Sequence, residues 1–320
     1  MSRLSPSSWF AAAVLGLVLT FSGPAAAAKT ITVVASIKPV HSLVAGVMQG
    51  VGRPHLIVKA SASPHSYSLK PSDAKAMQEA KVVVWVGDRL EAFLESSITS
   101  LAGKAEVVEL AEVPGLTRLA FREGGPWDAH DDHDAEQHDD EHHDAPDDID
   151  QHLWLDPDNA KAMVAAIAAA LAKADPDNAA IYTANEESMA RRLDALTAEI
   201  EAELAPVKDK PVIVFHDAFQ YFDTRFGLRN AGSLTVNPER QPGAARLKEI
   251  QARIKELGAG CVFAEPQFEP RLLQVVIEGT KAKTGTLDPL GADLPDGPEL
   301  YFELMRANAA ALKTCLAEAS

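Results

Sequence analysis

Short apolar runs alternate with amphipathic helical segments in the first part of the chain. The run KVVVWV at 81–86 is apolar at every position but its first, as in a strand covered on both faces. Strands that alternate with helices indicate a parallel sheet in an α/β lobe. The predicted elements are a strand at 31–37, a helix at 39–49, an apolar run at 56–58, a short helix from Pro71, a strand at 81–86, a helix near 90–101 and a strand at 107–110.

The same alternation returns after Pro206 and predicts a second lobe. Its predicted elements are strands at 211–215, 261–264 and 285–287 and helices at 247–257, 272–283 and 300–316. In such sheets, ligands bind beyond the carboxyl ends of the strands.

Two helices are predicted between the lobes. The first runs over 157–174, with Asp156 as N-cap and Pro157 at the first helical position. The second, at 175–205, would span roughly 45 Å at about 1.5 Å per residue, more than one small domain needs. We interpret it as a rigid helix joining an N-terminal lobe (29–174) to a C-terminal lobe (206–320); a long core helix of a single domain is the alternative. Its apolar stripe comprises Tyr182, Met189, Leu193, Leu196, Ile200 and Leu204.

The first 28 residues read as a secretory signal peptide. Arg3 precedes an apolar run at 10–21, and the small-residue tail at 24–28 offers an A-x-A cleavage site. No later segment reaches the roughly 20 apolar residues of a membrane span. We therefore expect an exported, periplasmic protein with no membrane span after cleavage.

A segment at 128–150 holds twelve Asp or Glu and no Lys or Arg. It contains little to bury, so we expect a disordered, solvated loop. Imidazoles interleaved with carboxylates favour a role in collecting metal ions, while an acidic solubilising spacer is the alternative. Its five histidines are the candidate auxiliary metal ligands: His130, His133, His138, His142 and His143.

The charge of the chain is concentrated in this segment, whose carboxylates account for most of the formal net charge of −16. The rest of the chain has no visible basic face, which argues against a nucleic-acid partner.

Two cysteines, Cys261 and Cys315, lie in the last quarter of the chain. In an oxidising compartment we expect them to form a disulfide that ties the C-terminal helix to the sheet; two free thiols are the alternative. No set of cysteines forms a zinc site here.

Four potential metal ligands lie at equivalent edges of the two lobes. His65 follows a strand-like run, His152 precedes a helix, and His216 and Asp288 each follow a predicted strand. Three imidazoles with one carboxylate or water suit a tetrahedral zinc site. His41 and His55, at a helix start and a turn, are interpreted as structural.

Four segments carry a family resemblance: PHSYSLKPSD at 64–73, HLWLDP at 152–157, FHDAFQYF at 215–222 and TLDPLG at 286–291. They resemble the signature segments of the periplasmic zinc-binding proteins of ABC importers, the ZnuA-like branch of the metal-binding solute-binding proteins. The resemblance covers essentially the whole mature chain, and the acidic loop and cysteine pair also resemble features of this branch.

The resemblance implies two α/β lobes bridged by a long helix, with one metal ion in the cleft between them. The implied ligands are His65, His152 and His216, with Asp288 as a fourth or outer ligand. In the related manganese and iron carriers, the third ligand position resembles a Glu. This chain has His216 at that position, which favours zinc. Some zinc members have a Glu before the first ligand; this chain has Pro64, so that role is not carried over.

The expected function is therefore the capture of periplasmic zinc by a monomer and its delivery to an ABC permease. A secreted zinc hydrolase is the first alternative, although no His-Glu-x-x-His motif appears and Asp288 or Glu265 would have to serve as base. A surface adhesin or metal-buffering protein is the second.

Overall fold

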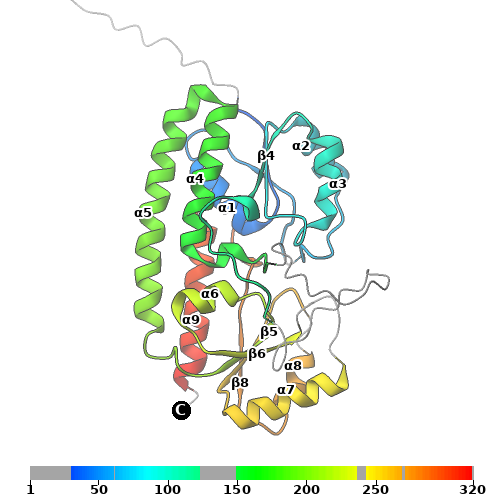
Figure 1. Ribbon diagram of the computed structural model, residues 1–320, viewed down its shortest axis with the longest axis vertical. Coiled ribbons are helices and arrows are strands. Elements are labelled where there is room, and N and C mark those ends of the chain that lie inside the picture. Colours follow the sequence, from blue (N-terminus) through cyan, green and yellow to red (C-terminus); the bar gives the residue numbers. More distant parts are fainter. Residues whose placement is uncertain (1–29, 61, 123–148, 236–242, 269–270, 319–320) are drawn as a thin grey trace, which may run out of the picture. The chain divides into compact units, whose positions relative to one another are not determined.

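The structure is a computed structural model that describes residues 30–60, 62–122, 149–235, 243–268 and 271–318. The predicted signal peptide and nearly all of the acidic segment, with its five histidines, lie outside the described residues. The described residues form two parallel-sheet α/β lobes, as predicted (Figure 1).

The first lobe is organised around a four-stranded parallel sheet in the order β2-β1-β3-β4. Every residue of β1 and β3 is buried, because these central strands are covered on both faces, as the apolar run at 81–86 predicts. Its elements are β1 (Val33–Ala35), α1 (Lys38–Val47), β2 (His55–Leu56), α2 (Pro71–Glu79), β3 (Val82–Trp85), α3 (Ala92–Leu101), β4 (Glu106–Glu109) and the 3-10 turn η1 (Leu110–Glu112).

The second lobe repeats the plan with the strand order β6-β5-β7-β8. Side chains alternate across β5: Val212 and Val214 enter one core, while Ile213 and Phe215 enter another with residues of α7 and α8. Its elements are β5 (Val212–His216), α6 (Gln220–Phe226), β6 (Asn230–Thr235), α7 (Ala244–Leu257), β7 (Cys261–Ala264), α8 (Arg271–Ile277), β8 (Lys283–Thr286) and α9 (Leu300–Glu318).

One predicted helix of this lobe is too long. The helix expected at 272–283 ends at Ile277, because Gly279 adopts φ +68° and the Thr280 N–H and hydroxyl both donate to the Ile277 carbonyl. The following strand accordingly begins at Lys283, two residues before the predicted start.

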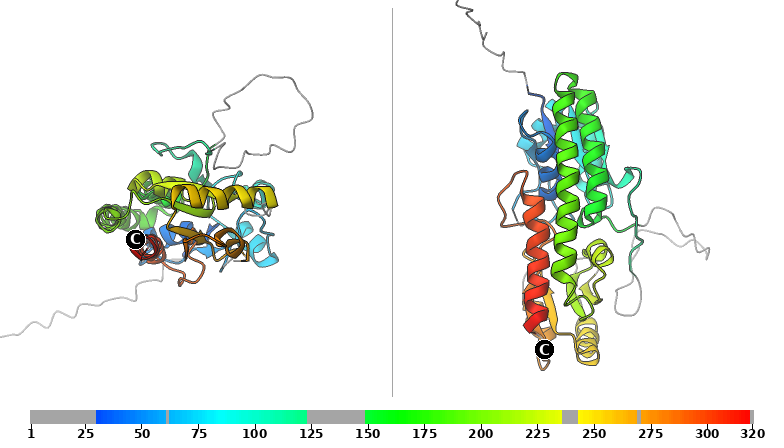
Figure 2. Two further views of the ribbon diagram at one scale, coloured as in Figure 1. Left: turned by 90° about the horizontal axis from the view of Figure 1, so that it is seen from below. Right: turned by 90° about the vertical axis from the view of Figure 1, so that its left-hand side faces the viewer.

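Two long helices lie side by side along the molecule, α5 (Ala179–Leu204) and α9 (Figure 2). Arg306 of α9 forms an ion pair with Glu199 of α5 at 2.8 Å. The predicted apolar stripe of α5 is buried throughout. Helix α4 (Pro157–Ala174), which follows the 3-10 turn η2 (Leu153–Leu155), packs beside α5. A second 3-10 turn, η3 (Pro176–Asn178), connects α4 to α5. One hydrophobic cluster includes residues of both sheets and of these helices, so α5 belongs to a core that the lobes share. The division at 174 and 206 stays a prediction.

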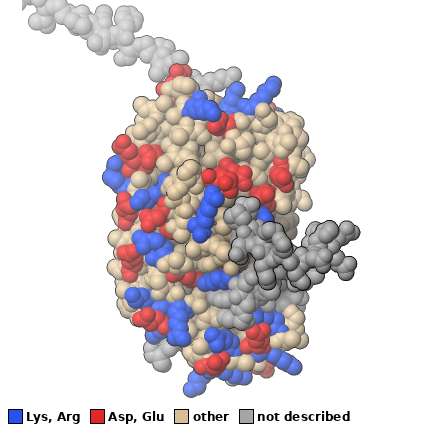
Figure 3. Space-filling view, viewed as in Figure 1, with Lys and Arg blue, Asp and Glu red and all other residues tan. Residues whose placement is uncertain are grey.

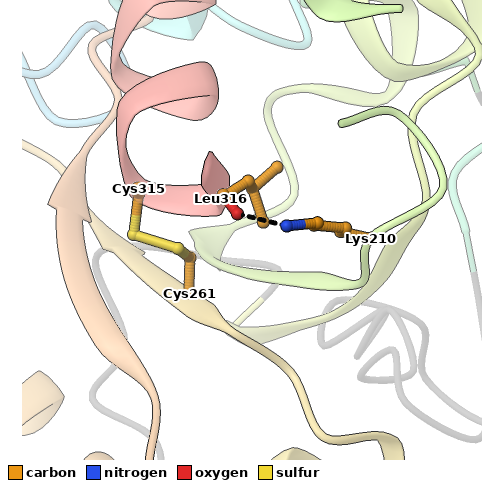
Figure 4. The surroundings of a disulfide bond; sticks show 4 residues. All are labelled: Lys210, Cys261, Cys315 and Leu316. Carbon is orange, nitrogen blue, oxygen red and sulfur yellow. Dashed lines mark hydrogen bonds between the residues drawn. A yellow bond between two sulfur atoms is a disulfide. The ribbon is translucent and has the colours of Figure 1, made fainter. Parts of the chain in front are cut away.

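A disulfide joins Cys261, the first residue of β7, to Cys315 of α9, as expected (Figure 4). The two Cα atoms lie 6.1 Å apart, and beside them the Lys210 ammonium donates to the Leu316 carbonyl at 2.7 Å. Because 54 residues separate the cysteines, constraint of the unfolded chain stabilises the fold by roughly 4 kcal/mol. The bridge fixes α9 to the second sheet.

Candidate metal centre

Three histidines from separate elements converge on one point. His65 lies in the loop between β2 and α2, His152 immediately precedes η2, and His216 is the last residue of β5. One ring nitrogen of each lies within 4.8 Å of the other two. The structure thus brings together three of the four residues predicted as ligands.

The spacing of the two buried imidazoles matches that of ligands to one ion. His152 Nε2 and His216 Nε2 lie 3.3 Å apart. Two nitrogens about 2.0–2.1 Å from one tetrahedral zinc are separated by roughly 3.3–3.4 Å. A shared ion therefore needs little rearrangement of this pair.

A carboxylate fixes the orientation of each buried imidazole. The Asp150 carboxylate accepts from His152 Nδ1 at 2.7 Å, and that of Glu265, just after β7, accepts from His216 Nδ1 at 2.6 Å. Because a carboxylate only accepts, each Nδ1 carries the proton, and in the neutral ring Nε2 presents a lone pair. Two lone pairs that face each other repel, so the geometry favours a cation or a proton between them.

The local charges act differently on the rings. Burial lowers the pKa of His216, but the adjacent Glu265 carboxylate outweighs burial and raises it above the ordinary value. His65 keeps an exposed edge. Partial loss of solvation around its ring is the main cause that holds its pKa well below the ordinary value, and the neighbouring imidazoles of His152 and His216 lower it further. His65 is therefore neutral at pH 7 and ready to bind a metal.

The three rings surround a small cavity of about 10 Å³, the size of one water molecule or ion. Its wall is largely apolar, with side chains of Pro64, Trp154, Phe268 and Leu290. An ion held there would lie against apolar surface on part of its periphery, and the two buried imidazoles would hold it away from bulk solvent on their side.

Asp288 is not a member of the histidine cluster. Its Oδ1 accepts from the Leu290 N–H and the Gln267 side chain, both at 2.9 Å, and its Oδ2 accepts from the Ala292 N–H at 2.5 Å. The carboxylate thus organises the turn after β8, and a direct ligand role for Asp288 stays a prediction.

The histidines interpreted as structural have partners outside the cluster. His41 Nε2 lies 3.2 Å from the Pro54 carbonyl, and His55 Nε2 lies 2.9 Å from the buried Asp73 carboxylate. These contacts tie α1, β2 and α2 together within the first lobe.

The predicted acidic loop, 128–150, extends two residues too far. Ile149 pairs with Ala120 in an antiparallel bridge, and Asp150 is fully buried. The Tyr221 hydroxyl donates to the Asp150 carbonyl at 2.8 Å. From composition, Asp150 was predicted to belong to the solvated acidic loop. In the structure its carboxylate instead orients the His152 ring.

An arginine before the acidic segment also contacts the second lobe. Arg122 Nε donates to Asp217 Oδ2 at 2.9 Å, and its guanidinium also reaches Asp223. Asp217 directly follows His216, so this contact holds Arg122 next to a residue that adjoins the histidine cluster.

Sequence reasoning missed the roles of Asp150 and Glu265 toward the histidines and did not consider Gln267. Position offers a signal for two of them: Asp150 lies two residues before His152, and Glu265 directly follows a predicted strand at the edge that carries His216. Carboxylates near candidate histidine ligands are expected to orient them.

Two surface properties bear on possible partners. Acidic and basic side chains are interspersed over the face shown in Figure 3. Of the described helices, none is both long enough and apolar enough to cross a membrane.

Two parallel-sheet lobes with a histidine cluster in a small cavity define a metal-binding solute-binding protein. The structure is similar to a crystal structure of ZnuA (TM-score 0.74, 24% identity, 89% of this chain and 99% of that one). It is also similar to the laminin-binding adhesin Lmb of Streptococcus agalactiae (TM-score 0.73, 28% identity, 89% and 99%).

The chain belongs to the ZnuA family. The model of that family, the periplasmic component A of the zinc-uptake complex, matches residues 33–315. The high-affinity zinc uptake system protein ZnuA of Brucella suis is 52% identical over 93% of this chain and 95% of its own length. The ZnuA protein of Yersinia pestis is 35% identical over 98% and 99%. The predicted resemblance is thereby confirmed.

Proposed function

We propose that this chain captures zinc in the periplasm with high affinity and delivers it to the permease of an ABC importer. The observation that carries the proposal is the pair of imidazole Nε2 atoms of His152 and His216, which lie 3.3 Å apart, in rings that are each oriented by a buried carboxylate. With His65 they form an all-nitrogen set, which suits zinc better than magnesium, calcium or manganese.

The proposed ligands are His65, His152 and His216, with a fourth ligand completing a tetrahedron. The two carboxylates considered as catalytic bases, Glu265 and Asp288, already accept hydrogen bonds from His216 and Gln267, which supports transport over hydrolysis. Family membership supports the same choice, because the relatives are named for zinc uptake. Export by cleavage of the first 28 residues and a monomeric state belong to this proposal.

Two experiments test it. Purified protein lacking residues 1–28 should compete with a high-affinity chelator for one zinc ion, and His152→Ala should lose that binding. Deletion of the gene should impair growth at low zinc, with rescue by added zinc. Cleavage of generic esters or peptides by the zinc-loaded purified protein, together with normal growth of the deletion strain at low zinc, would instead indicate a hydrolase.

A further inference from the structure

Zinc held by three imidazoles has one tetrahedral position left. The carboxylates next to the site are already engaged: Asp150 and Glu265 accept from the ligand rings, and Asp288 accepts from Gln267 and two backbone N–H groups. In the part of the chain that the structure describes, no further His, Cys, Asp or Glu joins the cluster. None of these carboxylates lies in the cluster, so a water molecule is the simplest fourth ligand in this arrangement.

The side chain of Gln267 lines the cavity, and its amide orientation is fixed. Its Nε2 donates to Asp288 Oδ1 at 2.9 Å. Because that carboxylate oxygen can only accept, the amide nitrogen faces Asp288 and the amide oxygen faces the other way.

That oxygen, Gln267 Oε1, is buried and has no donor within hydrogen-bond distance among the described residues. Buried acceptors are nearly always paired, because an unpaired one is costly. A metal-bound water is a strong donor, and the adjacent cavity has room for a single ion or water.

We propose that Gln267 is a positioning residue whose Oε1 accepts a hydrogen bond from the water that completes the coordination of zinc. Asp288 then acts on the metal through Gln267, by holding its amide in the required orientation. The inference rests on the proposed zinc-capture function. It also explains how a carboxylate outside the cluster can influence the site.

Three variants test the proposal. Gln267→Leu removes the acceptor at similar volume, Gln267→Glu keeps an oxygen acceptor but removes the donor to Asp288, and Asp288→Ala releases the amide. Gln251→Leu is the matched control, because the Gln251 amide also donates a hydrogen bond, to the backbone carbonyl of Glu278, but Gln251 lies on α7 outside the cavity. Zinc affinity is measured by chelator competition, and the visible absorption of the cobalt(II)-loaded protein reports the fourth ligand.

Gln267→Leu should weaken zinc binding about tenfold, as expected for loss of one hydrogen bond to a metal-bound group, and should alter the cobalt bands. Gln267→Glu should also alter the bands, because a carboxylate cannot donate to Asp288 Oδ1 and its oxygen is no longer held toward the water. Asp288→Ala should cost a similar factor, and combining it with Gln267→Leu should add little, because both disrupt one hydrogen bond. The control should match wild type in affinity and spectrum.

Several results would overturn the inference. Wild-type affinity and spectrum in Gln267→Leu would remove the residue from the site. Reduced affinity with unchanged cobalt bands and a lower apo-protein melting temperature would indicate a structural role only. Changed bands in Asp288→Ala but not in Gln267→Leu would make Asp288 itself the ligand. Failure of the proposed function is distinct: there the wild-type protein itself would lack tight zinc binding.

Discussion

The two parts of the histidine cluster are built differently. His152 and His216 are buried, adjoin regular elements and are each oriented by a buried carboxylate. His65 is exposed and lies in a loop, where its backbone N–H donates to the Ser63 hydroxyl at 3.3 Å. Protein carboxylates orient the buried pair before any ion arrives, whereas no hydrogen bond from the described residues orients the His65 ring. Most of the binding free energy should therefore depend on the buried pair.

Loss of a buried imidazole should have the largest effect. Total zinc binding energies of about 10–16 kcal/mol shared among four ligands predict that His152→Ala or His216→Ala weakens binding roughly 10²–10³-fold. His65→Ala should cost less, because fixing the orientation of its ring on binding offsets part of the gain from that ligand. Chelator competition measures all three.

His41→Ala serves as a control for imidazole loss outside the cluster and should leave zinc affinity unchanged. Equal losses for His65→Ala and His152→Ala would contradict the proposed difference between the two parts.

The orienting carboxylates should rank next. Asp150→Asn and Glu265→Gln keep the shape but remove the charge that favours the Nδ1 proton, so zinc affinity should fall about 10–100-fold. Ser63→Ala, the corresponding change beside His65, should have little effect. Isothermal titration calorimetry with a competing ligand separates these cases, and the melting temperatures of the apo variants check that each folds.

Acidity should act mainly through His216. Its pKa is raised by Glu265, so its ring takes up a proton at a higher pH than an ordinary imidazole does, and that proton must leave before zinc binds. Affinity should therefore begin to fall on acidification above the ordinary imidazole pKa of about 6.5, approaching tenfold per pH unit once the ring is protonated. His65, with its lowered pKa, contributes only at lower pH.

Zinc dissociation constants measured from pH 8 to 5 check this order. Glu265→Gln should shift the onset to lower pH, because removing the carboxylate lowers the His216 pKa. An unchanged onset in that variant would assign the pH dependence to another group.

The elements that sequence reasoning predicted best have strong apolar patterns. The buried stripe of α5 and the continuous run of β3 are both found as expected. By contrast, α6 and β6 were not predicted: α6 is short, and β6 (NAGSLT) has only one large apolar residue, so its burial comes from pairing beside β5. Tertiary context decided both elements.

Three of the four residues predicted as ligands lie together in the structure: His152 and His216 adjoin element ends, and His65 lies in a distinctive loop segment. Their partners were harder to predict. Glu265 meets His216 across 49 residues, and the Gln267–Asp288 hydrogen bond joins the ends of two strands. Such pairings depend on strand order in the sheet, which periodicity does not specify. The role of Asp150 was not predicted, because it is the last of the twelve acidic residues of the segment 128–150 and its composition does not distinguish it from the others.

The smallest effect on tight binding should come from the acidic segment itself. Its composition predicts a solvated loop, and zinc bound by such a loop would bear the entropy of ordering the chain. Deleting 128–148 while keeping Ile149 and Asp150 should therefore preserve one tight zinc with unchanged affinity. It should remove additional weak binding and slow loading when zinc is scarce. Calorimetry and stopped-flow loading measure both properties.

A second deletion, of 128–150, tests where the acidic segment ends and the site begins. It removes only two more residues, but one of them is the carboxylate that orients His152, so tight binding should fall about 10–100-fold, as for Asp150→Asn. Equal tight affinity in the two deletions would mean that Asp150 does not organise the site. If the shorter deletion matches the full-length protein in stoichiometry and loading rate, the segment is a solubilising spacer, and the metal-collecting role is wrong.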